Sequence, residues 1–85
     1  MNRKCYRLYK KAKANPKGLR FPELKTLCEC IGMVCDRVKG SHFIYKLEEP
    51  FFLTSIQRMK DRKAKPYQVR QLLDFIEDNN FDVME

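Results

Sequence analysis

Apolar residues recur along this chain with two different periods, and each period predicts a type of secondary structure. In three stretches every third or fourth position is apolar, which is the spacing of one face of a helix. The stripes are Cys5, Leu8, Tyr9 and Ala12, then Phe21, Leu24, Leu27, Cys28 and Ile31, and last Val69, Leu72, Leu73 and Ile76. We therefore predict helices over residues 2–14, from near Pro22 to Gly32, and from Pro66 to Asn79-Asn80.

Between the second and third helices, apolar and polar residues alternate as they do in strands. Strands are expected over residues 33–38, 41–47 and 51–57, with tight turns at Lys39-Gly40 and Glu48-Glu49-Pro50. Alternation assigns Phe43, Tyr45 and Leu47 of the middle strand to the core face, and His42, Ile44 and Lys46 to the other. In the third strand Phe52, Thr54 and Ile56 lie together on one face. A bulge after Gly40, which would change this facing, is the alternative.

The order of elements is helix, helix, three strands, helix, and it predicts an α+β fold. Three antiparallel strands present an apolar face that must be covered, and the flanking helices are its natural cover. The expected architecture is a three-stranded antiparallel sheet with helices on one face. The other sheet face stays open and carries His42.

Charge is distributed unevenly over the 85 residues, whose net charge is +7. The first twenty residues hold eight basic side chains and no acid, and residues 58–70 hold six against Asp61 alone. Such clustering favours a polyanionic partner, most simply RNA, and a surface selected only for solubility is the alternative. With no apolar run near about 18 residues and no apolar leader at the start, we expect a cytoplasmic protein without membrane contact.

The four cysteines are Cys5, Cys28, Cys30 and Cys35. Without a secretion signal we expect free thiols rather than disulfides. Zinc is disfavoured, because Cys28 and Cys30 lie two apart in a predicted helix and so point to different faces. We expect no metal and no cofactor.

His42 is the only histidine, and an imidazole exchanges protons readily at neutral pH. It suits a general base that removes the proton of an RNA 2′-hydroxyl, while nearby cations stabilise the negative charge that develops on phosphate. Supporting candidates are Lys39, Gly40, Ser41, Lys65, Tyr67 and Arg70. The alternatives are a surface histidine at a strand start, solvated lysines and arginine, and a Tyr67 that caps the core instead of stacking a base.

Three blocks of the sequence, which together span about two-thirds of the chain, resemble the HicA family of toxins. The blocks are Phe21-Pro22-Glu23-Leu24 through Ile31-Gly32-Met33, then Arg37-Val38-Lys39-Gly40-Ser41-His42-Phe43-Ile44-Tyr45, and last Lys65-Pro66-Tyr67-Gln68-Val69-Arg70-Gln71-Leu72-Leu73. In this chain Phe43 follows Gly-Ser-His, where family members often have a polar residue or a second histidine.

The resemblance implies a double-stranded-RNA-binding-domain-like fold and an endoribonuclease that cleaves mRNA, an mRNA interferase. It makes His42 the catalytic residue and a HicB-like antitoxin protein the partner. On this interpretation residues 1–18 form an additional N-terminal basic helix, residues 19–80 the HicA-like toxin domain, and residues 81–85 a C-terminal tail. Two other interpretations stay open, a non-catalytic RNA-binding module and a partner-binding subunit with no nucleic-acid role.

Overall fold

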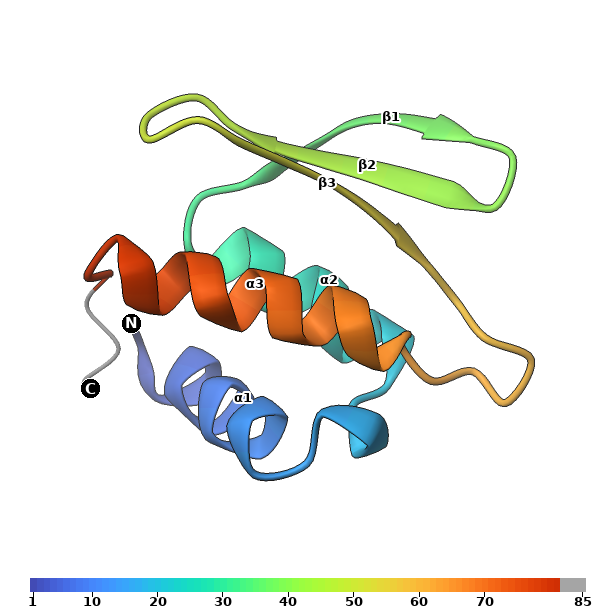
Figure 1. Ribbon diagram of the computed structural model, residues 1–85, viewed down its shortest axis with the longest axis horizontal. Helices are drawn as coiled ribbons and strands as arrows, with labels where there is room; N and C mark the ends of the chain where they lie inside the picture. The colour runs from blue at the N-terminus through green and yellow to red at the C-terminus, as the bar shows by residue number, and fades with distance from the viewer. Residues whose placement is uncertain (82–85) are drawn as a thin grey trace.

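The computed structural model of the chain describes residues 1–81, and it is an α+β fold with three α-helices and one three-stranded antiparallel sheet (Figure 1). The elements are α1 (Arg3–Ala14), the short 3₁₀ helix η1 (Pro16–Gly18), α2 (Phe21–Cys30), β1 (Val34–Lys39), β2 (His42–Leu47), β3 (Phe52–Gln57) and α3 (Pro66–Asp78). Every predicted helix and strand is present, with ends that differ by a residue or two. The η1 turn was not predicted.

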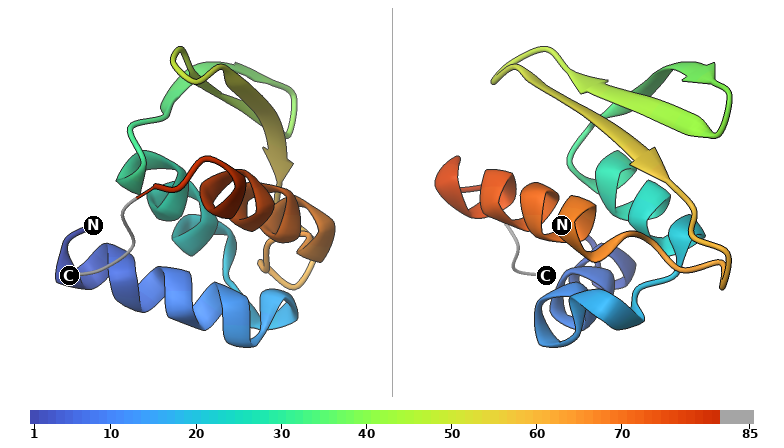
Figure 2. Two further views of the ribbon diagram at one scale, coloured as in Figure 1. Left: turned by 60° about the vertical axis from the view of Figure 1, so that its left-hand side comes forward. Right: turned by 45° about the vertical axis from the view of Figure 1, so that its right-hand side comes forward.

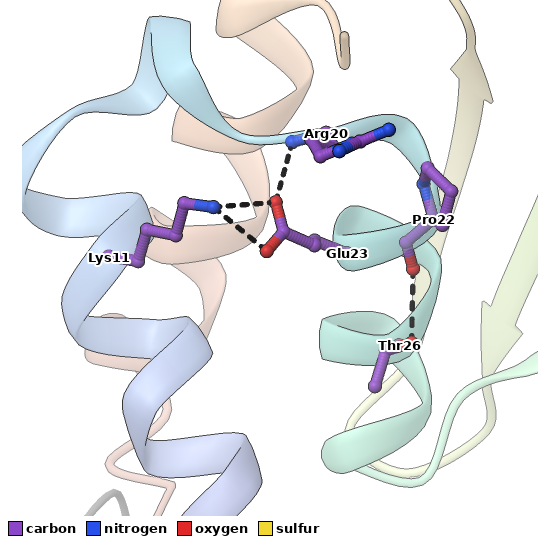
Figure 3. A network of polar contacts seen from close by, with 5 residues as sticks. All are labelled: Lys11, Arg20, Pro22, Glu23 and Thr26. Carbon is purple, nitrogen blue, oxygen red and sulfur yellow. Dashed lines mark hydrogen bonds and ion pairs between the residues drawn. The ribbon is translucent and has the colours of Figure 1, made fainter. Parts of the chain in front are cut away.

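The helix ends are fixed by local hydrogen bonds and by residues that stop a helix. The Asn2 side chain accepts a hydrogen bond from the Cys5 N–H at 2.8 Å and so caps α1. At the start of α2, the Glu23 carboxylate accepts from the Arg20 N–H at 2.9 Å (Figure 3). Gly32, with φ of +93°, follows α2 in a conformation that favours glycine, as its predicted role as a helix stop requires.

The strands are paired in the order β1-β2-β3, and their register sets the direction of each side chain. His42 lies opposite Lys39 on one side and opposite Gln57 on the other. The irregularity of the sheet lies between Cys35 and Arg37 in β1, so the bulge considered after Gly40 is not there and β2 keeps its predicted facing. Tyr45 is accordingly buried, and His42 is exposed.

The elements form three layers (Figures 1 and 2). The sheet packs over α2 and α3, and α1 lies on the far side of those two helices. Tyr9 and Ala12 of α1 belong to the same core cluster as the buried residues of α2 and α3. The Tyr9 hydroxyl also donates to the Glu77 carboxylate of α3 at 3.1 Å, and Lys13 forms an ion pair with the same carboxylate. The predicted cover of one sheet face by helices is confirmed, with α1 as a second helical layer.

The prediction of four free thiols is wrong for two of them, because Cys5 and Cys30 form a disulfide with a Cα–Cα distance of 5.8 Å. Cys5 lies on the buried stripe of α1, and Cys30 is the last residue of α2, which packs beside it. Spacing along the sequence does not show this contact, since 25 positions separate the two residues. Cys28 is free and buried, and burial raises the pKa of its thiol to about 12. Cys35 is free and exposed.

The predicted C-terminal tail is described only at its first residue. The centroid of the Phe81 ring lies 5.6 Å from the centroid of the Phe75 ring, and Phe81 packs against the core. The other residues of that prediction, 82–85, lie outside the described part of the chain. In residues 1–81 no helix is long and apolar enough to cross a membrane.

Candidate functional site

His42 is the first residue of β2, and it projects from the open face of the sheet. Its ring nitrogen Nδ1 lies 3.1 Å from the Ser55 hydroxyl oxygen on β3. Ser55 lies opposite Ile44, so it shares the open face with His42 one diagonal step away. Within residues 1–81, Ser55 is the hydrogen-bond partner that the structure gives the imidazole. This residue was not among the predicted site residues, and its outward position in β3 was the signal that could have found it.

A chain of hydrogen bonds joins two predicted residues, Ser41 and Lys65, beside the histidine. The Lys65 ammonium donates to the Gln57 side-chain oxygen at 2.6 Å, and the Gln57 side-chain amide donates to the Ser41 hydroxyl at 2.9 Å. Gln57 lies directly opposite His42 in the sheet, so the chain runs past the imidazole. Sequence reasoning missed Gln57, although it is the residue that connects the other two.

Gln68 fixes the start of α3 against the free edge of β3. Its side-chain amide donates to the Ser55 carbonyl oxygen at 2.7 Å, and its side-chain oxygen accepts from the Gln57 N–H at 3.0 Å. One buried amide thus replaces a neighbouring strand at this edge, and it satisfies two backbone groups that would otherwise lack a partner. The start of α3 therefore lies at the end of the sheet where β2 begins (Figure 1). Lys65 reaches that end through its hydrogen bond to Gln57, which lies opposite His42.

Tyr67 lies beside Gln68, whose side-chain nitrogen is 3.2 Å from the tyrosine hydroxyl. The tyrosine is 61% exposed, so the alternative in which it caps the core is wrong. Its ring remains available as a surface on which a base could stack.

Some of the other predicted residues lie close to the histidine and some do not. Lys39 lies directly opposite His42 in the register of β1 and β2, and its side chain is exposed. Gly40 forms the turn between the two strands with φ of +61°. Arg70 is exposed on α3, and no contact joins it to His42 within residues 1–81. Asp36, the acidic residue of β1, is paired with Arg37 at 2.9 Å.

The end of the first basic segment, residues 1–20, meets the middle of the second, residues 58–70. The Phe21 N–H donates to the Arg62 carbonyl oxygen at 3.1 Å, and Arg20 and Lys63 form an isolated β-bridge. Arg20 therefore joins the cations of the loop between β3 and α3. Helix α1 lies across the helical layer from the sheet (Figure 2). The cations that the strand register and the hydrogen bonds place beside His42 are Lys39 of the hairpin and Lys65 of the loop.

No group of three or more histidine, cysteine, aspartate or glutamate side chains suitable for a metal ion is present among residues 1–81. We found no match to this chain among protein-family models, curated proteins or solved structures. The fold and the site therefore describe the protein without assigning it to a family. It is a small α+β protein whose open sheet face carries an exposed imidazole beside lysines from two different elements.

Proposed function

We propose that this protein is an endoribonuclease and that His42 is its general base. The observation that carries the proposal is the exposed imidazole held at Nδ1 by Ser55, next to a lysine held by Gln57. A hydrogen bond at one ring nitrogen orients the ring, and in the tautomer in which Nδ1–H donates to Ser55, Nε2 is free to accept a proton.

In the proposed reaction, Nδ1–H donates to the Ser55 hydroxyl and Nε2 removes the proton of an RNA 2′-hydroxyl. The 2′-oxygen then attacks the adjacent phosphorus, the bond from phosphorus to the 5′-oxygen breaks, and the 5′-oxygen takes a proton from solvent. The products are a 2′,3′-cyclic phosphate end and a 5′-hydroxyl end. Lys39 and Lys65 flank the imidazole and would stabilise the negative charge that develops on the phosphate oxygens. The attacking group comes from the substrate, so the reaction needs RNA and does not need a metal ion.

The resemblance to the HicA family extends the proposal to biological role. We propose a double-stranded-RNA-binding-domain-like fold for residues 19–80, mRNA as substrate, and a toxin activity restrained by a HicB-like antitoxin that covers the open sheet face. Support comes from the Gly-Ser-His hairpin and from the α2, three strands, α3 order that follows the N-terminal helix. Cleavage of mRNA would place the protein in the cytoplasm, where disulfides are rare, so the Cys5–Cys30 bond would be an exception there.

RNA cleavage in the presence of EDTA tests the catalytic proposal. The parent protein should produce 2′,3′-cyclic phosphate ends, and His42→Ala should abolish cleavage while RNA affinity and the thermal unfolding curve stay close to the parent. Lys46→Ala is the matched control, since Lys46 lies on the same strand and the same face but at the far end. Cleavage by His42→Ala at the parental rate would show that the histidine is not the base.

A non-catalytic RNA-binding module is the second candidate, favoured by the exposed Tyr67 beside the basic loop. It predicts RNA affinity that falls steeply with salt, because counterions are released from phosphate, without any strand cleavage. Absence of RNA affinity at low salt would favour a partner-binding subunit instead.

A further inference from the structure

A cavity of about 320 Å³ opens at the same end of the sheet as His42, lined by Phe21, Ser41, Phe43 and Arg58. His42 points to the open face, whereas Phe43, the next residue, points toward the helices. Ser41 belongs to both sites, because it lines the cavity and its hydroxyl accepts the hydrogen bond from Gln57. The cavity and the imidazole are thus separated by the thickness of one strand.

The walls of the cavity are aromatic. The rings of Phe21 and Phe43 pack edge to face, with centroids 5.3 Å apart. The Lys25 ammonium lies 4.7 Å from the Phe43 centroid and 5.9 Å from the Phe21 centroid, within the range of a cation–π contact. A planar, polar ring system is the type of ligand that such walls favour, because it can stack on aromatic carbon and present polar edges to a cation.

The rim of the cavity is positively charged. Arg58 is exposed, and the loop that follows it returns to the start of α2 through the Arg20–Lys63 bridge. Asp61 is the one acidic residue of that loop, and its carboxylate accepts the Lys63 N–H at 3.0 Å. Phosphates on either side of a bound base would therefore meet cations and little negative charge.

We propose that this cavity binds one nucleobase of the RNA strand next to the linkage that His42 cleaves. Its volume is at the lower limit of small-molecule sites, which run from about 300 to 1,000 Å³, so it fits a single ring system rather than a larger ligand. An RNA strand that crosses the end of the sheet would place one phosphate near His42 and turn the neighbouring base under the hairpin. Arg58 would contact the polar edge of that base, so the cavity would influence where RNA is cut. This inference rests on RNA being the substrate, as proposed above.

Binding measurements on uncleavable RNA test the cavity separately from catalysis. We would use a short 2′-O-methyl oligonucleotide, which lacks the attacking hydroxyl, and replace each base in turn by an abasic residue. One position should stand out, with affinity for the parent protein lowered about fivefold or more, as expected for loss of a stacked base. Phe43→Leu and Arg58→Gln should each weaken binding of the complete oligonucleotide and remove the extra effect of that abasic position.

The matched controls are Phe51→Leu and Lys46→Gln, which change an exposed phenylalanine and a lysine at the far end of the sheet. Arg58→Gln decides the question if Phe43→Leu unfolds, because Arg58 is exposed. The proposal would be overturned if every abasic position lowered the affinity of the parent protein equally. It would also be overturned if the abasic position that stands out lowered the affinity of Arg58→Gln as much as that of the parent. A mononucleotide that binds as tightly as the oligonucleotide would also overturn it, since the ligand would then be a free nucleotide. None of these results depends on cleavage, so failure of the catalytic proposal would be seen separately, in the EDTA assay.

Discussion

Gln68→Leu is expected to loosen the junction between α3 and the sheet, and with it the geometry around His42. Leucine has nearly the same size but cannot make the two hydrogen bonds that Gln68 forms with the edge of β3. Gln68 is 3% exposed, so water has little access to replace it on the helix side. The backbone groups left without a partner would be the Ser55 carbonyl and the Gln57 N–H.

The magnitude follows from these two contacts. Each hydrogen bond contributes a net of about 1 kcal/mol, and a buried polar group left unpaired costs about 1–3 kcal/mol. Because β3 is an edge strand, water can partly reach the two groups, and the apolar leucine offsets a part of the loss. We therefore expect the free energy of unfolding to fall by about 2–3 kcal/mol. For a chain of this length that corresponds to a decrease in Tm of about 10–20 °C.

Urea unfolding followed by circular dichroism would measure the change. Gln71→Leu is the graded control, since Gln71 lies on the same helix, is exposed, and accepts one hydrogen bond from Thr54 at 3.2 Å. Its free energy of unfolding should fall by about 1 kcal/mol, because one hydrogen bond is lost instead of two and only the Thr54 hydroxyl is left without its partner. If the free energies of unfolding of Gln68→Leu and Gln71→Leu differ by less than about 0.5 kcal/mol, the two hydrogen bonds of Gln68 do not stabilise the edge of β3 more than a single surface hydrogen bond would.

The remaining predictions concern the cysteines and one carboxylate. In a thiol titration without reductant, the native protein should expose one reactive thiol, Cys35, and denaturant should add Cys28 as the second; four thiols under those conditions would contradict the disulfide. Reduction of the disulfide should lower the free energy of unfolding by about 3 kcal/mol, since a loop of this length is no longer closed in the unfolded chain. Burial tends to raise the pKa of Glu23, but the hydrogen bonds from Lys11 and the α2 N-terminus outweigh it and hold the pKa below its usual range (Figure 3). The ionised Glu23 carboxylate therefore stabilises the folded protein at neutral pH, and this stabilisation is lost as the pH falls through the lowered pKa. Glu23→Gln should have a smaller free energy of unfolding than the parent at pH 7 and the same free energy in strong acid. A difference in free energy of unfolding that does not change with pH would refute this.

Much of the fold was determined by residues that act locally. The apolar stripes specified the helices, Pro66 and Gly32 marked helix ends, and the alternation in β2 put His42 on the open face. These features depend on neighbours within a few positions, because the periods of helix and strand are short. A lone histidine at a predicted hairpin could therefore be placed on the correct face before any tertiary contact was known.

The contacts that give the site its form were decided only by the tertiary structure. The register of β2 and β3 brings Ser55 and Gln57 beside His42. The contact of α3 with the edge of β3 brings Gln68 to Gln57. The same holds for the disulfide between Cys5 and Cys30, and for the place of α1 on the side of α2 and α3 that faces away from the sheet (Figure 1). Polar side chains give no periodic signal for their partners, and a hydrogen bond requires two groups to lie within about 3 Å. Local sequence patterns thus specify the elements and their faces, whereas the long-range packing of those elements specifies which side chains meet at the imidazole.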